Sequence, residues 1–156
     1  MGVRKAFLLL IVLGVLTGCS AGRKARTAKI ESVIGAARSY IGTPYRYGGV
    51  TRSGMDCSGL LVASFHSVDM QVPRTSKEQS RYGKKVNIEG LRPGDVVFFA
   101  AKKRRRKVSH AGLVTRVEGN RSVKFIHSST SLGVVETELY TDYYQSIFVK
   151  ARRPKY

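Results

Sequence analysis

The chain has 156 residues and a formal net charge of +18, from 28 lysines and arginines against 10 aspartates and glutamates. This length leaves room for one domain and little else. So large a positive charge indicates an anionic partner, but by itself it does not distinguish nucleic acid from wall polymers or acidic lipid headgroups.

The N-terminus has the features of an export signal. Arg4 and Lys5 precede an apolar run over residues 6–16, which is too short to cross a bilayer comfortably as a helix. The four residues that end at Cys19, Leu-Thr-Gly-Cys, resemble the bacterial lipobox, in which the cysteine sulfur receives a diacylglycerol and the preceding peptide is removed. We therefore expect a lipoprotein signal peptide over residues 1–18 and lipidation at Cys19.

The residue after Cys19 indicates where the anchored protein resides. Ser20 at this position resembles lipoproteins that are sorted to the outer membrane of bacteria with two membranes. We expect a protein of the cell envelope, held by two or three acyl chains in the outer membrane and facing the periplasm. An exported protein rarely meets nucleic acid, so we expect no nucleic-acid partner. The positive charge then points to peptidoglycan carboxylates, lipopolysaccharide phosphates or acidic headgroups.

Helices are predicted in the first half of the mature chain. Residues 19–28 are small and basic without an apolar period and are interpreted as a lipidated tether, followed by one domain over residues 29–156. Apolar residues recur every three or four positions over residues 30–41, which predicts a helix that the next Gly-Thr-Pro sequence ends. The glycine-bearing segment 45–56 is expected to be a loop, and a second helix is expected from Ser58.

Strands are predicted in the second half. An apolar run over residues 96–100 follows the turn sequence Leu-Arg-Pro-Gly-Asp, and a Gly-Asn pair at 119–120 predicts a tight hairpin. Four further strand candidates cover residues 110–117, 122–128, 134–139 and 147–152. Helices first and antiparallel strands afterwards predict an α+β fold, with N-terminal helices packed on an antiparallel sheet of about five strands.

The two cysteines have different predicted fates. Cys19 is expected to be lipidated, so Cys57 has no disulfide partner in an oxidising compartment. Cys57 is then either an inert buried thiol or a reactive one. Cys57 lies where a glycine-bearing loop enters a helix, and Asp56 before it is a natural N-cap. A sulfur at that place faces unpaired backbone amides and the positive end of the helix dipole. We therefore expect a lowered thiol pKa and an oxyanion hole.

A thiol nucleophile needs a base and a group that orients the base. His66 follows Cys57 on the same predicted helix, and a turn of about 100° per residue directs it to the opposite face, towards solvent. His110 and His127 lie on the two strands of the predicted hairpin and at the same end of it. We expect their imidazoles to lie side by side. A zinc site formed by Cys57, His110 and His127 would lack any short-range ligand pair, so no metal is expected.

Five segments, in this order along the chain, resemble the NlpC/P60 family: GTPYRYGG from Gly42, DCSGLL from Asp56, VPRTSKEQ from Val72, LRPGDVVFF from Leu91 and SHAGLV from Ser109. The resemblance continues to the His127 strand and covers nearly everything from residue 29 to the end. It implies a papain-like fold in which Cys57 is the nucleophile, His110 the base and His127 the orienting third residue. Four more residues match positions that line or brace the site, the first being a tyrosine whose hydroxyl lies near the thiol: Tyr45, Asp56, Ser58 and Arg74.

The resemblance implies a monomeric lipoprotein endopeptidase without a cofactor. Its thiolate would attack an amide of peptidoglycan, in either the D-glutamyl–diaminopimelate bond or the D,D cross-link, and would pass through an acyl-enzyme. Two other classes remain open: a non-catalytic envelope adaptor that binds wall or lipid, and an amidase or acyltransferase with the same triad. The basic segment 102–107 is interpreted as a solvated loop near the rim of the cleft.

Overall fold

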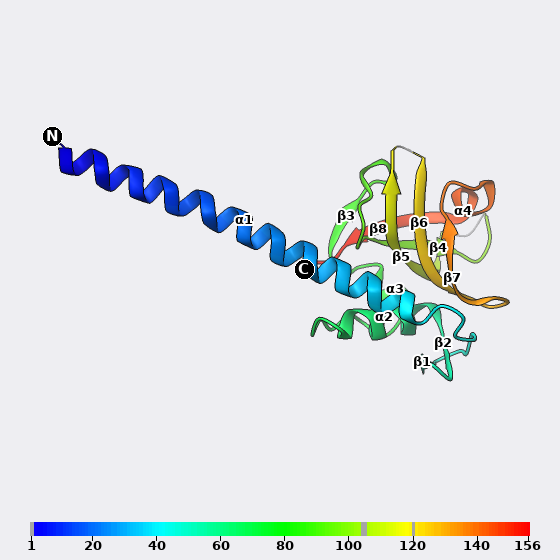
Figure 1. Cartoon of the computed structure of the whole chain (residues 1–156). Coiled ribbons are helices and arrows are strands. Elements are labelled where there is room, and N and C mark those ends of the chain that lie inside the picture. Colours follow the sequence, from blue (N-terminus) through cyan, green and yellow to red (C-terminus); the bar gives the residue numbers. More distant parts are fainter. Residues whose placement is uncertain (1, 104–105, 120) are drawn as a thin grey trace.

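The computed structural model describes residues 2–103, 106–119 and 121–156. A long N-terminal helix, α1 (Gly2–Ser39), leads into a domain in which its last turns and helix α2 (Cys57–His66) lie beneath a sheet (Figure 1). The basic segment 102–107 and the turn 119–120 each include residues outside the described ranges.

The main sheet has six strands in the order β3-β8-β4-β5-β6-β7, and every neighbouring pair is antiparallel. The strands are β3 (Lys84–Val86), β4 (Val96–Ala100), β5 (Val108–Glu118), β6 (Ser122–Ser129), β7 (Gly133–Glu138) and β8 (Phe148–Arg153). The predicted α+β class is confirmed, and the five predicted strands correspond to β4 to β8. The sixth, β3, was not predicted because three residues, two of them exposed lysines, carry no recognisable strand pattern.

The remaining elements are short. A two-stranded hairpin, β1 (Val50–Thr51) and β2 (Gly54–Met55), precedes α2. Helix α3 (Ser76–Gln79) lies between α2 and β3, a 3-10 helix (Ile88–Gly90) lies between β3 and β4, and α4 (Asp142–Ile147) connects β7 to β8.

The sheet is buried on both faces. The cluster between the sheet and helices α1 and α2 includes Val33, Ala37, Leu60, Leu61, Phe65, Phe98, Leu113 and Ile126. The cluster on the opposite face includes Val97, Phe99, Val114, Phe125, Leu139, Ile147 and Ala151. Each large apolar side chain buried in this way contributes about 1.5–3 kcal/mol to the hydrophobic driving force. This packing fixes α2 against the central strands and thereby sets the position of its first residue.

Residues 20–28 are helical and continue α1 without a break. Alanine, lysine and arginine are among the strongest helix formers, no proline interrupts the segment, and the Thr27 hydroxyl donates to the Arg23 carbonyl at 3.1 Å. The structure thus gives this segment a regular conformation that the missing apolar period did not predict; its role as a tether stays a prediction. Among the described residues, none of the helices is long and apolar enough to cross a membrane.

Candidate active site

Cys57 is the first residue of α2 and lies beside a surface hollow. The helix is capped by Asp56, whose carboxylate accepts a hydrogen bond from the Gly59 N–H at 2.6 Å. The thiol is free, and the residue is only 8% exposed. The hollow has a volume of about 420 Å³, and its lining includes Tyr45, Tyr47, Gly48, Asp56, Cys57, Ser58, Arg74 and Ser109. A buried thiol therefore borders a space that is large enough for part of a peptide.

The loop before α2 packs tightly against the first turn of the helix. A Cβ on Gly59 would lie 2.1 Å from the carbonyl oxygen of Gly49, so only glycine fits at this position. The same Gly49 oxygen accepts a hydrogen bond from the Asp56 N–H at 3.1 Å. The glycines of the DCSG and YGG segments thus hold the loop and the cysteine in a fixed relation.

The pKa of the Cys57 thiol is raised, in contrast to the lowering expected from the sequence. Burial is the largest cause, and the negative charge of Asp56 adds to it. Backbone N–H groups of Ala111, Ser58 and Cys57 itself donate to the sulfur and oppose the shift, but they do not outweigh it. The helix N-terminus was predicted correctly; the depth of burial, which decides the sign of the shift, was not apparent from the sequence.

Strand β5 brings a histidine next to the cysteine. Its Ala111 N–H is one of the three backbone groups that donate to the sulfur, so the thiol lies against the residue that follows His110. Strands β4 and β5 change register at this place: Phe99 pairs with His110 and Ala100 with Val108, which leaves Ser109 as an extra residue on β5. A bulge of this kind redirects side chains and is frequent next to active sites. Ser109 itself lines the hollow.

His110 and His127 lie side by side, as the hairpin register predicted. Nε2 of His110 is 2.9 Å from Nδ1 of His127, and the two rings are perpendicular with centroids 4.9 Å apart. His127 is 3% exposed and stacks on Phe125. His66, at the end of α2, is exposed to solvent, as expected.

Both imidazoles are neutral at physiological pH. Burial lowers the pKa of His110 to about 4. Burial, with a smaller contribution from the charge of His110, lowers the pKa of His127 to about 3. A neutral base and a protonated thiol are therefore the resting forms of the pair.

An ionic network forms the other wall of the hollow. Arg74 donates to both carboxylate oxygens of Asp56, at 3.0 and 2.8 Å, and to the Ser58 hydroxyl at 2.9 Å. The Ser58 hydroxyl donates in turn to Asp56 at 2.9 Å, and the Gly48 N–H donates to the same carboxylate at 2.9 Å. Burial alone would raise the pKa of Asp56, but the hydrogen bonds from Arg74, Gly59 and Ser58 outweigh it, so the pKa is lowered. Asp56 is thus held as a carboxylate.

Tyr45 also borders the hollow, next to the thiol. Burial raises the pKa of its hydroxyl, and the charges of Cys57 and Asp56 raise it further. The phenol therefore stays protonated and remains a hydrogen-bond donor. The structure thus brings Tyr45, Asp56, Ser58 and Arg74 to one hollow with the thiol, while the side chain of Cys19 lies outside what the structure describes.

Sequence reasoning missed two residues behind the histidine pair. Nε2 of His127 is 3.2 Å from the Thr137 hydroxyl and 3.2 Å from the Tyr144 hydroxyl. Thr137 lies on β7, the strand next to β6, and the register of predicted strands could have suggested it. Tyr144 comes from α4, a six-residue helix that the sequence did not indicate.

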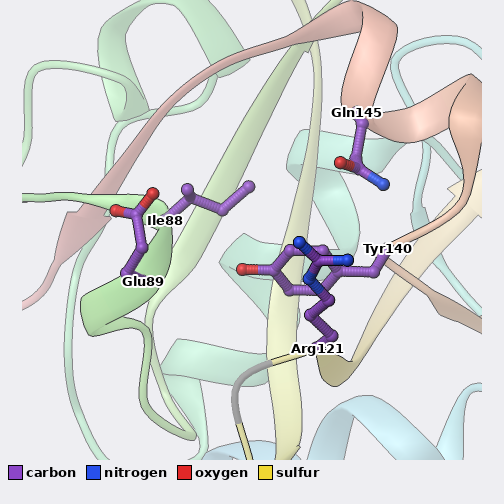
Figure 2. A pocket seen from close by; sticks show the side chains of 5 residues that line it. All are labelled: Ile88, Glu89, Arg121, Tyr140 and Gln145. Carbon is purple, nitrogen blue, oxygen red and sulfur yellow. The ribbon is translucent and has the colours of Figure 1, made fainter.

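A second hollow of about 680 Å³ lies elsewhere on the domain (Figure 2). Its lining is Ile88, Glu89, Arg121, Tyr140 and Gln145, without a thiol or an imidazole. It therefore has no nucleophile of the cysteine type. Within the described ranges, no group of three or more histidine, cysteine or acidic side chains is arranged to hold a metal ion.

Comparisons with known proteins match the same region. The NlpC/P60 family model matches residues 42–153. The probable endopeptidase NlpC of Escherichia coli (strain K12) is 38% identical over 155 residues, which cover 94% of this chain and 97% of that protein. The murein DD-endopeptidase MepS/murein LD-carboxypeptidase of the same strain is 37% identical over 113 residues, or 72% of this chain and 56% of that protein. A crystal structure of an NlpC/P60 family protein from Bacillus cereus ATCC 10987 matches with a TM-score of 0.70 and 31% identity, over 80% of this chain and 39% of that one.

Proposed function

Because the chain belongs to the NlpC/P60 family, we propose that it is a cysteine endopeptidase that hydrolyses amide bonds in the stem peptides or cross-links of peptidoglycan. The observation that carries the proposal is a free thiol at the start of α2, held against the strand whose His110 is 2.9 Å from His127. The substrate class is supported by relatives named as endopeptidases, one of them a murein endopeptidase.

In the first step, the Cys57 sulfur attacks the carbonyl carbon of the scissile amide and its proton passes to Nδ1 of His110. Nδ1 is the ring nitrogen that remains for this task because Nε2 is paired with His127. Burial raises the pKa of the thiol and lowers the pKa of His110, so both partners start uncharged. Proton transfer therefore accompanies the attack and does not precede it.

The negative charge that develops on the carbonyl oxygen is stabilised by the helix N-terminus. The backbone N–H groups of Cys57 and Ser58 lie at the sulfur, and the positive end of the α2 dipole points to the same place. The protonated hydroxyl of Tyr45 is a further donor on this side of the hollow.

The intermediate collapses when the C–N bond breaks. The His110 imidazolium returns its proton to the leaving amine, and the acyl group stays on the sulfur as a thioester. A water molecule then attacks the thioester while His110 again takes up a proton. The carbon–sulfur bond breaks, the carboxylic acid leaves, and the thiol is restored.

The test is digestion of purified peptidoglycan with wild-type protein and with Cys57→Ala, followed by mass spectrometry of the products. New muropeptides that appear with the wild type alone are expected. Masses of free stem fragments would assign cleavage between D-glutamate and diaminopimelate, whereas separated cross-linked partners would assign the D,D bond. No new muropeptides, together with tight binding to the wall, would favour the adaptor class instead. Intact stem peptides released from glycan would favour an amidase.

We also propose that Cys19 carries the lipid anchor and that the protein faces the periplasm from the outer membrane. The proposal is supported by the Leu-Thr-Gly-Cys sequence and by the cluster of basic residues directly after it, at 23, 24, 26 and 29. Metabolic labelling with an alkynyl fatty acid should label the wild type and not Cys19→Ala, and fractionation should place the labelled protein in the outer membrane. Equal labelling of both proteins would contradict the assignment.

A further inference from the structure

His127, the second histidine of the pair, is itself held by two hydroxyl groups. His127 uses Nδ1 for His110, and its Nε2 faces the Thr137 Oγ1 and the Tyr144 hydroxyl, each at 3.2 Å. The three side chains come from β6, β7 and α4, so three separate elements meet at one ring nitrogen.

The positions of the hydrogen atoms follow from the proposed role of His110. If Nδ1 of His110 accepts the thiol proton, then its Nε2 carries a hydrogen, which it donates to Nδ1 of His127. Nδ1 of His127 is then an acceptor, and the single hydrogen of this neutral ring must lie on Nε2. In the opposite tautomer, two N–H groups would face each other at 2.9 Å. A hydrogen-bond acceptor is therefore needed to stabilise the hydrogen on Nε2 of His127.

We propose that Thr137 and Tyr144 are positioning residues that accept the Nε2–H of His127 and so fix the tautomer of both histidines. The inference rests on the proposed function, since it assumes that Nδ1 of His110 is the base. It adds two residues to the machinery of the reaction, and neither is among the described residues that line the hollow beside Cys57.

Burial gives the two contacts their effect. His127 is 3% exposed, so bulk water could not accept a hydrogen bond from its Nε2–H if both hydroxyls were missing. The Tyr144 ring is fixed by Phe99 and Phe125, with centroids 5.3 and 4.9 Å away. Burial raises the pKa of Tyr144, and a hydrogen bond with Thr137 partly opposes the shift. The phenol therefore stays uncharged over the working pH range and does not place a negative charge beside the imidazole.

The two hydroxyls are redundant acceptors, which leads to a specific pattern of effects. Either oxygen can accept the Nε2–H alone, so removal of one hydroxyl leaves the tautomer in place. Removal of both leaves the buried N–H unpaired and frees the ring to take the opposite tautomer. The effects of the two substitutions should therefore be more than additive.

The test compares Thr137→Val, Tyr144→Phe and the double variant in the full chain, with kcat and KM measured on soluble muropeptides. We expect less than about 3-fold loss of kcat for each single variant and about 10- to 100-fold for the double variant, with KM nearly unchanged. Restoring one hydroxyl, in Thr137→Ser with Tyr144→Phe, should recover most of the activity. Tyr143→Phe is the matched control, because Tyr143 is the neighbouring tyrosine and is 63% exposed. Equal, additive losses or a change in KM alone would overturn the proposal.

A second background separates positioning from general damage. In His127→Ala, the hydroxyls have no imidazole to hold, so the double substitution should cause no further loss of kcat. The same further loss in that background would show that the hydroxyls act through something else.

NMR of the ¹⁵N-histidine-labelled protein tests the tautomer without reference to activity. His127 should carry its hydrogen on Nε2 in the wild type and should lose this preference in the double variant. An Nδ1–H tautomer of His127 in the wild type would overturn the inference even if peptidoglycan is cleaved. The expected tautomer in a protein that cleaves no peptidoglycan would overturn the proposed function and leave the hydroxyl contacts standing.

Discussion

The two walls of the candidate active site hold their polar groups in opposite ways. The wall at the start of α2 is ionic: the Asp56 carboxylate accepts hydrogen bonds from Gly48, Ser58, Gly59 and, twice, from Arg74. The wall formed by β5, β6 and β7 is neutral: His110 contacts His127, and His127 contacts two hydroxyls. Cys57 lies between them, in contact with a backbone group of each.

The difference shows how one buried site can contain both a fixed charge and a mobile proton. Asp56 is satisfied so completely that its pKa falls, and it keeps its charge through the reaction. Among the residues that the structure describes, the histidines contact neutral polar groups, so burial lowers their pKa and they release a captured proton readily. A carboxylate beside His110 would have held the proton more tightly. The neutral wall thus suits a base that must soon act as an acid towards the leaving amine.

Removing the base should have the largest effect. For His110→Ala, we expect the rate of muropeptide cleavage to fall about 10²- to 10⁴-fold, because the imidazole that is proposed to take the thiol proton is removed. His66→Ala is the control, since His66 is exposed at the far end of α2. Cleavage by His110→Ala within a few-fold of the wild type would show that the base lies elsewhere.

The two walls should also lose stability in different pH ranges. Each histidine has a folded pKa below its unfolded value of about 6.5, so the unfolded chain binds more protons and stability falls as the pH drops from about 6.5 to the folded values of about 4 and about 3. For His110 alone, this loss amounts to about 3 kcal/mol at pH 4. The pKa of Asp56 is lowered, so the ionic wall weakens only at still more acid pH.

Urea unfolding at several pH values measures this contribution. The double variant His110→Gln, His127→Gln should show a much smaller decrease in unfolding free energy between pH 7 and pH 4 than the wild type. A decrease of the same size in both proteins would mean that the histidines are not the groups that titrate.

A smaller loss of stability is expected when the ionic wall is broken. Arg74→Met removes two hydrogen bonds to Asp56 but leaves those from three other groups, so we expect a loss of about 1–2 kcal/mol at pH 7. Lys77→Met, on the adjacent helix α3, removes an exposed charge and should change stability by less than about 0.5 kcal/mol. Equal effects of the two substitutions would mean that the Arg74–Asp56 ion pair contributes no more to the free energy of unfolding than an ordinary surface charge.

Local patterns were enough to predict much of this arrangement. The glycine-rich loop before a helix predicted Cys57 at an N-terminus, and the hairpin predicted from Gly119-Asn120 gave a register in which His110 lies beside His127, as observed. Both predictions depend on one element or on two neighbours joined by a short turn. They hold because the helix period and the hairpin register are fixed by backbone geometry.

Features that depend on distant elements were missed. Strand β3 forms only because β8, far along the chain, offers it an edge. Tyr144 reaches His127 from a short helix that is stabilised by packing on Phe99 and Phe125. The sign of the Cys57 pKa shift depends on how deeply the sheet and loop bury the sulfur. These properties arise from tertiary packing, which the periodicity of a single segment does not contain.

The smallest expected effect concerns the thiol itself and decides whether the neutral wall leaves it uncharged. Burial raises the pKa of Cys57 and lowers the pKa of His110, so alkylation by iodoacetamide in the absence of substrate should have its midpoint above the ordinary thiol value of 9.0. His110→Ala should move that midpoint by much less than one pH unit, because a neutral imidazole exerts no charge on the sulfur. A midpoint near or below neutral pH that rises in His110→Ala would instead reveal a resting thiolate–imidazolium pair. The wall described as neutral would then hold a charged His110 imidazolium in spite of its burial. The two walls would no longer differ in charge at the catalytic pair.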